Sequence, residues 1–316
     1  MAHEIETEQP SEDTGSPAGR LSPLVLLGTS TWTYEGWQGD VYKKRYPKSR
    51  FKRDWLAEYA EYEFEGERLF RTVGADHTFY GPPTAKLLNH YASLLPPGFK
   101  MCTKVWEEIT VPVYPSGLRY AKKAGKNPHF LDATYFQEQV LSPFDEAFKE
   151  HTGPLIFEFQ RTGIDAKEFL PRLDQFLGHL PKRYEYAVEV RNPAVLGSDY
   201  RTILTDHGVS HVYNHLYAMP PLETQHDKLN GTFTAPFVLF RLLTPRDKKY
   251  HDAVKAYEPY DKLVHPLPDM RAQTVKLVKQ AVMEHRQAYV LVNNRTEGNA
   301  PQTTKALYAR LRQLSL

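Results

Sequence analysis

Val25-Leu-Leu-Gly-Thr-Ser-Thr31 is a short β-rich run that leads directly into polar residues, and seven similar runs follow it in the 316-residue chain. Amphipathic segments separate these runs, and such an alternation of strand and helix is typical of a parallel sheet. The eight predicted strands are Val25 to Thr31, Arg71 to Asp76, Phe99 to Lys104, Leu155 to Phe159, Tyr186 to Val190, Ser210 to Asn214, Phe237 to Leu242 and Ala288 to Asn293. The pattern predicts an α/β fold, a TIM-type (β/α)8 barrel with its site at the carboxyl ends of the strands.

The segments between the strands predict the outer helices and three extended loops. Those with helical spacing are Asp54 to Tyr62, Thr84 to Leu95, Tyr135 to Lys149, Ala166 to Leu180, Asp199 to His207, Pro268 to Arg286 and Gln302 to Leu314. Loops are expected after strands three, six and seven, at Tyr114 to Pro128, Pro220 to Thr234 and Pro245 to Lys262. Long loops of this kind often carry function.

The composition is that of an ordinary globular domain, with 41% hydrophobic and 25% charged residues. The net charge of +2 gives no overall field that would draw the chain to nucleic acid or to an acidic membrane. We expect residues 24–316 to form a single barrel domain. Residues 1–23, which contain many Glu, Ser, Pro and Gly, are expected to form a disordered tail rather than a signal peptide.

The single cysteine and the absence of long apolar runs bear on where the protein works. Cys102 lies in an apolar run and has no partner for an intramolecular disulfide, which fits a reducing compartment. No stretch approaches the roughly 18 consecutive apolar residues that span a bilayer. We therefore expect a cytoplasmic protein without a membrane segment.

Polar side chains stand at the end of every predicted strand. Because side chains alternate along a strand, such residues can point into the barrel mouth above apolar layers. In chain order they are Ser30 and Trp32, Asp76, Lys104, Glu158, Glu189 and Arg191, Asn214 and His215, Arg241, and Asn293 and Asn294. Charges buried in a barrel are costly unless they pair or face a wet mouth, so we interpret this ring as the ligand site. The alternative is a paired polar plug that only closes the barrel.

The charged members of the ring suggest acid/base chemistry. Glu158 and Glu189 lie on neighbouring predicted strands, and their approach would raise the pKa of one carboxyl group and create an acid/base pair. Glycosidases of the large barrel clan carry their carboxylates on strands four and seven. Here strand seven ends in Arg241, which argues against that class.

A metal site is a weaker interpretation of the same ring. Asp76 and His215 could join the two glutamates in an oxygen-rich site for a divalent cation. Lys104, Arg191 and Arg241 bring positive charge to the same mouth, however. No cofactor or metal is therefore predicted.

Aromatic residues crowd the first two strand ends. Trp32, Tyr34, Trp37 and Tyr80 could form a stacking platform for a sugar or a base, or they could cover the core as lids. His215 also has two interpretations. It could contact a ligand, or it could be a structural histidine whose hydrogen bonds are satisfied within the protein.

A segment after strand eight, residues 293–301, ends in Gly298-Asn-Ala-Pro301 just before the last predicted helix. Backbone amides at that helix start, with Gly298 allowing close approach, suit an anion such as a phosphate. The alternative is a turn with a proline at the helix start, which needs no ligand. Phosphate-binding and dinucleotide fingerprints, zinc-ligand spacings and serine hydrolase elbows do not occur.

Several short motifs recur in order from Leu26 to Leu314 and resemble one family. They are Gly28-Thr-Ser-Thr-Trp-Thr-Tyr-Glu-Gly-Trp37, Thr78-Phe-Tyr80, Pro96-Pro-Gly-Phe99, Lys104, Val188-Glu-Val-Arg-Asn-Pro193, Asn293-Asn294 to Gly298, and Ala300-Pro301. The chain resembles the YecE-like family, domain of unknown function 72. The resemblance implies a TIM-type barrel and a loose relation to sugar isomerases, and its motif residues carry over to Trp32, Tyr80, Lys104, Glu189, Arg191, Arg241, Asn293 and Asn294.

The chain departs from the family pattern at three strand ends, which identifies a divergent branch. Gly74 in Val73-Gly-Ala-Asp76 stands where the family has the glutamate of Val-Glu-x-Asn. Phe157-Glu158-Phe159-Gln160 replaces Phe-Gln-Leu-Pro. In Arg241-Leu-Leu-Thr244, Leu243 replaces the histidine of Arg-Leu-His-Gly.

Three functions follow from these observations. The first is an enzyme for a small polar or phosphorylated sugar-like substrate, with Glu158 or Glu189 as general base and Lys104 or Arg241 stabilising an oxyanion. The second is a binder without turnover, in which Arg191, Arg241, the asparagines and the aromatics hold an anionic metabolite or a nucleotide. The third, and least favoured, is nucleic-acid binding through the basic loops Tyr120 to Lys126 and Arg246 to Lys249.

Overall fold

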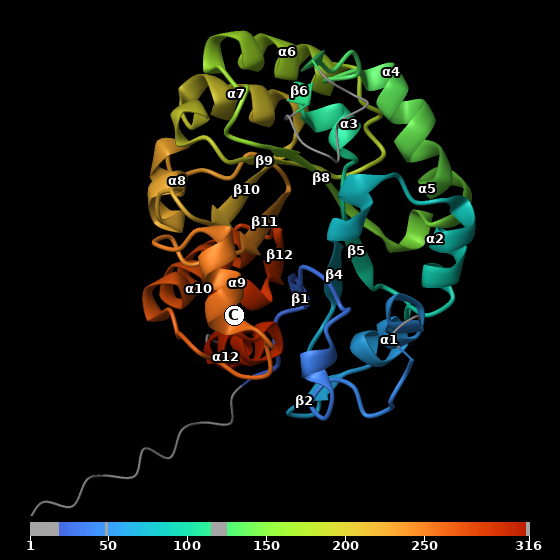
Figure 1. Cartoon of the computed structure of the whole chain (residues 1–316). Helices are drawn as coiled ribbons and strands as arrows, with labels where there is room; N and C mark the ends of the chain where they lie inside the picture. Colours follow the sequence, from blue (N-terminus) through green and yellow to red (C-terminus); the bar gives the residue numbers. More distant parts are fainter. Residues whose placement is uncertain (1–18, 48–49, 115–124, 314–316) are drawn as a thin grey trace, which may run out of the picture.

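Eight parallel strands close into a barrel in the computed structural model, which describes residues 19–47, 50–114 and 125–313. The strands are β1 (Val25–Thr29), β4 (Thr72–Ala75), β5 (Lys100–Lys104), β8 (Thr152–Phe159), β9 (Tyr186–Val190), β10 (Ser210–His215), β11 (Phe237–Leu242) and β12 (Gln287–Val292). Each pairs with its predicted neighbour, and β1 closes the ring against β4 and β12 (Figure 1). The predicted TIM-type barrel is confirmed.

Helices surround the strands as an outer layer (Figure 1). They are α1 (Phe51–Ala60), α2 (Ala85–Ala92), α4 (Ala133–Phe136), α5 (Ser142–Ala147), α6 (Ala166–Gly178), α7 (Ser198–His207), α10 (Pro268–Met283) and α12 (Ala300–Arg312). The segment predicted as one helix from Tyr135 to Lys149 is divided by a π-helical turn over Gln137–Leu141. Pro143, in the first turn of α5, has no backbone N–H to donate to the preceding turn, which accounts for the interruption.

The three predicted loops contain short elements. After β5 come α3 (Glu107–Thr110) and the strands β6 (Val113–Tyr114) and β7 (Gly125–Lys126), whereas α8 (Leu222–Lys228) follows β10 and α9 (Tyr250–Tyr257) follows β11. Helix α9 packs against α11 (Asn294–Glu297), which follows β12, so both lie at the carboxyl end of the barrel. A small hairpin of β2 (Glu63–Phe64) and β3 (Glu67–Arg68) precedes β4. None of the helices in the described ranges is long and apolar enough to cross a membrane.

The chain already contacts the barrel before β1. Residues 1–18 of the predicted tail lie outside the described residues. Leu21 is buried, and Arg71 Nη1 donates to the Ser22 carbonyl oxygen at 3.1 Å. Part of the segment assigned to the tail therefore packs on the barrel.

The barrel interior changes from apolar to polar over one step of the strand repeat. Its apolar layers are formed by Leu26, Cys102, Ile156, Ala187, Val212, Leu239, Tyr289 and Leu291 together with Ala235 and Phe237. Because side chains alternate along a strand, the residue two positions further on points to the same face. Those positions hold Lys104, Glu158, Glu189, Asn214, Arg241 and Asn293. The strand repeat alone therefore delivers a polar layer to the carboxyl end.

Gly28 sets how closely β1 and β4 approach. A Cβ at this position would lie 2.7 Å from the Thr72 carbonyl carbon, which is backbone and cannot turn away. We predict that Gly28→Ala destabilises the fold by about 3 kcal/mol or more, because overpacking a rigid contact forces the strands apart. Urea unfolding followed by circular dichroism measures this. Gly81→Ala is the control, since a Cβ there meets nothing within 4 Å; equal midpoints for the two variants would contradict the close approach.

Candidate ligand-binding site

Arg241 lies at the centre of the polar layer, with only 1% of its surface exposed. Its Nη2 donates to both carboxylate oxygens of Asp76, at 2.6 and 2.8 Å. Its Nη1 donates to Glu158 Oε2 at 3.1 Å and to Glu189 Oε2. One guanidinium thus joins carboxylates from the ends of β4, β8 and β9.

Glu158 is the second centre of the same network. Its Oε2 accepts from Lys104 Nζ at 2.6 Å, Arg191 Nη2 at 2.7 Å and Arg241 Nη1 at 3.1 Å. Gln160, two positions further along the chain, donates to the other oxygen, Oε1. Arg191 also reaches Glu189 Oε1 through its Nε, at 3.0 Å.

This charge network therefore contains three cations and three carboxylates: Lys104, Arg191, Arg241, Asp76, Glu158 and Glu189. The formal charges cancel. Cancellation is what allows Glu158, Glu189 and Arg241 to stay almost fully buried, because an unpaired charge at such depth would cost several kcal/mol. The structure thus brings together six of the predicted site residues.

The predicted raised pKa is wrong for Glu158. Glu158 and Glu189 are register partners on β8 and β9, as expected for an acid/base pair. Burial alone would raise the pKa of Glu158, but Arg191, Lys104 and Arg241 outweigh it and lower the pKa to about 2. Glu158 is therefore a carboxylate at neutral pH and a weak base. The three cations around Glu158, and not its approach to Glu189, decide the direction of the pKa shift.

The pKa of Lys104 is shifted in the direction that favours the neutral amine. Burial lowers its pKa from the usual 10.5, although Glu158 and Asp76 oppose that shift. The ammonium lies 3.8 Å from the centre of the Phe79 ring. The Thr78 hydroxyl lies 2.6 Å from the carbonyl oxygens of both Ala75 and Lys104, so it fixes the 3-10 turn Asp76–Tyr80 against the end of β5.

Three members of the network reach the surface. The exposed fraction of the side chain is 31% for Asp76, 22% for Arg191 and 11% for Lys104. These three residues form what we term the rim. Arg191 Nη1 makes no hydrogen bond to another described residue, and the Asp76 oxygens retain lone pairs. The rim can therefore donate to an anion and accept from a hydroxyl.

The side-chain oxygens of the asparagines after β12 accept hydrogen bonds within the chain. Asn293 Oδ1 accepts from Arg295 N at 3.0 Å, and Asn294 Oδ1 accepts from Trp37 Nε1 and Ala300 N. Asn299 caps α12 by accepting from Gln302 N. These side chains occupy amides that were considered for an anion, which supports the alternative of a turn without a ligand.

The backbone conformation and packing at position 298 explain the presence of glycine there without a ligand. Its φ of 112° is favourable only for glycine, and a Cβ there would lie 2.7 Å from the Lys262 carbonyl oxygen. The residue lets the loop after α9 pack against the start of α12. Nothing in this packing requires a bound phosphate.

The aromatic residues near β1 divide between core and surface. Trp32 and Trp37 are buried; Trp37 stacks on Tyr42 and Tyr59. Tyr34 packs edge-on against Tyr260 and is partly exposed. Tyr80 is exposed and ends the 3-10 turn that begins at the rim residue Asp76. Burial of the two tryptophans fits the lid interpretation, whereas Tyr80 lies at the surface.

His215 lies apart from the charge network. It follows Asn214, so it points to the opposite face of β10, and its Nδ1 donates to the Thr244 carbonyl oxygen at 2.8 Å. Burial lowers its pKa to about 4. His215 lines a separate cavity together with Arg246, Asp247 and His265, residues from loops that sequence reasoning did not connect.

A metal site is not visible in the geometry. Across residues 19–47, 50–114 and 125–313, no group of three or more His, Cys, Asp or Glu side chains is arranged to hold a metal ion. The carboxylates that were considered as ligands are instead paired with arginine and lysine. The basic loop Tyr120 to Lys126 falls mostly outside the described residues.

Loss of Arg241 would leave three carboxylates, two of them buried, with two cations. We predict that Arg241→Met destabilises the fold by about 3–5 kcal/mol. The double variant Arg241→Met/Glu189→Gln should lose about 1–3 kcal/mol less stability than the sum of the two single-variant losses, because the second substitution restores charge balance. Urea unfolding of the two single variants and the double variant measures the coupling. The control is Lys276→Gln, which breaks an exposed pair with Glu223 and should leave the midpoint unchanged; strict additivity at Arg241 and Glu189 would contradict a coupled network.

The depressed pKa of Glu158 also predicts a pH dependence of stability. A carboxyl group whose pKa is about 2 in the folded chain and about 4.5 when unfolded stabilises the fold above pH 4.5. That contribution is lost as the pH falls from 4.5 toward 2. Glu158→Gln should therefore lose less stability than the wild type between pH 5 and pH 3, by urea unfolding. The exposed Glu146→Gln is the matched control; the idea fails if Glu158→Gln follows the wild-type slope.

Comparisons with known proteins agree on one family. The family model described as protein of unknown function DUF72 matches residues 26–315. A DUF72 family protein from Enterococcus faecalis V583 aligns with a TM-score of 0.63 at 19% identity, covering 92% of this chain and 96% of that one. A DUF72 family protein from Thermotoga maritima MSB8 aligns with a TM-score of 0.59 at 21% identity, covering 91% and 98%.

At these identities the solved structures bear on the fold alone. No curated protein is significantly similar to this chain. The family match covers nearly all of the barrel, from the first strand to the last helix. The chain therefore belongs to the DUF72 family.

Proposed function

We propose that the barrel mouth binds a small hydroxylated anion, of the size and chemistry of a sugar phosphate. The observation that carries the proposal is the composition of the rim, where two cations and one carboxylate of the charge-balanced network are partly exposed. Arg191 and Lys104 would contact the anionic group. Asp76 would accept a hydrogen bond from a hydroxyl group.

The buried glutamates support the rim in this proposal. Glu158 and Glu189 hold Arg191 by its Nε and Nη2, so its remaining nitrogen is oriented before a ligand arrives. Preorganisation of this kind reduces the entropy lost on binding. The low pKa of Glu158 makes it a scaffold rather than the general base that the sequence suggested.

Proton transfer by Lys104 is a second candidate, favoured by one observation. Burial lowers the pKa of its amine, and the side chain lies at the rim where a bound carbonyl compound would be within reach. A lysine whose pKa is lowered is a better candidate for removing a proton next to a carbonyl group than an ordinary lysine. This would make the protein an enzyme of the isomerase type, with Lys104 in place of the glutamates.

A thermal-shift screen of sugar phosphates tests the binding proposal. Glucose 6-phosphate, fructose 6-phosphate and ribose 5-phosphate are compared with the unphosphorylated sugars and with inorganic phosphate. A ligand at about 100 times its Kd stabilises by about 2.7 kcal/mol, so the wild-type midpoint should rise with a sugar phosphate. The rise should be lost in Arg191→Gln and kept in Arg310→Gln, an exposed arginine on α12.

Two results would contradict the proposal: no compound shifts the wild type, or the shift survives Arg191→Gln unchanged. For a compound that binds, proton NMR in deuterated water separates binder from enzyme. Exchange of a carbon-bound hydrogen that disappears in Lys104→Met supports catalysis. Binding without exchange leaves the protein a binder.

A further inference from the structure

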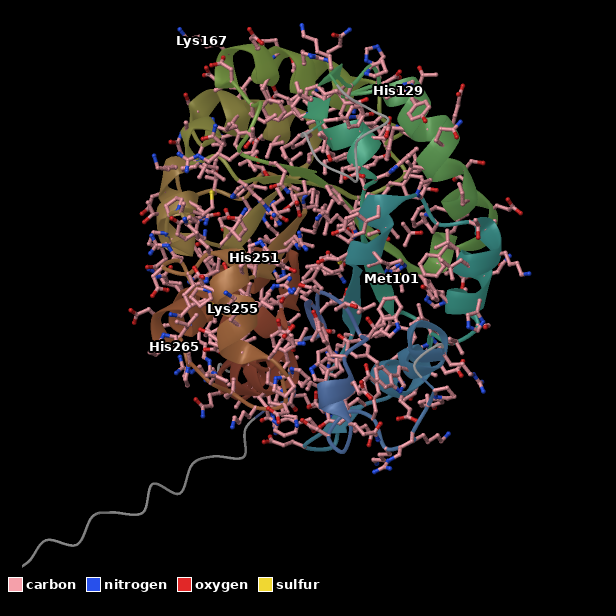
Figure 2. The ribbon with its side chains drawn as sticks, in the orientation of Figure 1. Met101, His129, Lys167, His251, Lys255 and His265 are labelled. Atoms are coloured by element: carbon pink, nitrogen blue, oxygen red, sulfur yellow. The ribbon has the colours of Figure 1, made fainter. Side chains whose placement is uncertain are left out.

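A second cavity, of about 420 Å³, opens beside the ends of β10 and β11. It lies between the loops after those strands and the first turn of α10. None of the six residues of the charge network is among those that line it. His265, one of its residues, lies at the edge of the molecule beside α10 (Figure 2).

His215 provides a buried hydrogen-bond acceptor in this cavity. The residue is 7% exposed, and its Nδ1 is occupied by the Thr244 carbonyl oxygen. A carbonyl only accepts, so Nδ1 carries the hydrogen and Nε2 carries a lone pair. No described residue donates to Nε2. The backbone of Leu243 and Thr244 donates to the His215 carbonyl oxygen, at 2.9 and 3.2 Å, which fixes the histidine in place.

Positive charge enters the same cavity from one side. Arg246 Nε donates to the Met219 carbonyl oxygen at 2.7 Å, which holds the guanidinium while its terminal nitrogens bond to no other described residue. The first turn of the 16-residue helix α10 forms part of the wall, and its N-cap Leu267 provides no side-chain cap. The N1 residue Pro268 has no backbone N–H, Leu267 N donates to Glu297 Oε1, and Asp269 brings a carboxylate to the same turn. Arg246 is therefore the cationic contact in this cavity.

Two carboxylates, Asp247 and Asp269, also line the cavity. With His215 Nε2 they make three acceptors beside one guanidinium. The two carboxylates would repel a ligand that carries only a negative charge, and Arg246 would repel a ligand that carries only a positive charge. A molecule that carries both charges can contact the guanidinium and these acceptors together.

We propose that this cavity binds a free α-amino acid, with its carboxylate on Arg246 and its ammonium group on His215 Nε2 and Asp247. The site is independent of the barrel mouth. It requires neutral His215, which its low pKa provides at physiological pH.

The test is saturation-transfer NMR and calorimetry on the full-length protein with the common L-α-amino acids as probes. At least one should bind, and its des-amino acid and its decarboxylated amine should bind at least tenfold more weakly. His215→Asn keeps an N–H for Thr244 but removes the Nε2 acceptor, and Arg246→Gln removes the cation. Each should weaken binding at least tenfold, whereas Arg191→Gln and Arg310→Gln should not.

The proposal is overturned if no amino acid binds the wild type, or if the singly charged analogues bind equally well. It also fails if the cavity variants bind like the wild type. Circular dichroism establishes that each variant is folded. Asp247→Asn provides a further variant, at an exposed position, and it should weaken binding several-fold. Unchanged affinity in this variant would contradict the proposed contact between Asp247 and the ammonium group.

Discussion

A buried guanidinium must find enough negative charge to remain buried, and Arg241 is where this constraint acts. It contacts carboxylates at the ends of three strands, and two of these carboxylates, Glu158 and Glu189, are almost inaccessible to water. The desolvation cost of such a cluster is recovered only if every charge has a close partner. Lys104 and Arg191 complete that balance, and their positions follow from the strand ends on which they lie. The mouth is therefore fixed as a unit.

The same constraint decides the chemistry that the mouth can perform. A pair of glutamates on adjacent strands suggests an acid/base pair, yet three cations on Glu158 keep it ionised. What remains available to a ligand is the rim of Asp76, Arg191 and Lys104. Its mixed charge is the basis for proposing a hydroxylated anion as the ligand.

The barrel could be predicted from sequence because strand periodicity is a local signal. The apolar run of each strand, followed two positions later by a polar residue such as Glu158 or Arg241, also revealed the polar layer. The pairing among those residues could not be predicted, because alternation gives a face but not a distance. The pKa direction of Glu158 depended on neighbours from β5, β9 and β11, which only the closed ring brings together.

Other features were missed for related reasons. The sequence around Gly298 has the composition of an anion-binding helix start, but the side chains of Asn294 and Asn299 occupy its amides. The cavity at His215 joins loops after two strands to α10, and no spacing in the chain links them. Short-range patterns therefore identified the mouth, whereas contacts between distant loops required the structure.

The most direct test of the account is a crystal structure of the protein grown with a sugar phosphate. The account predicts phosphate density against Arg191 and Lys104, a ligand hydroxyl on Asp76, and the Arg241 guanidinium still in contact with all three carboxylates. Density for the phosphate elsewhere, or an Arg241 side chain turned away from Glu158 and Glu189, would contradict it.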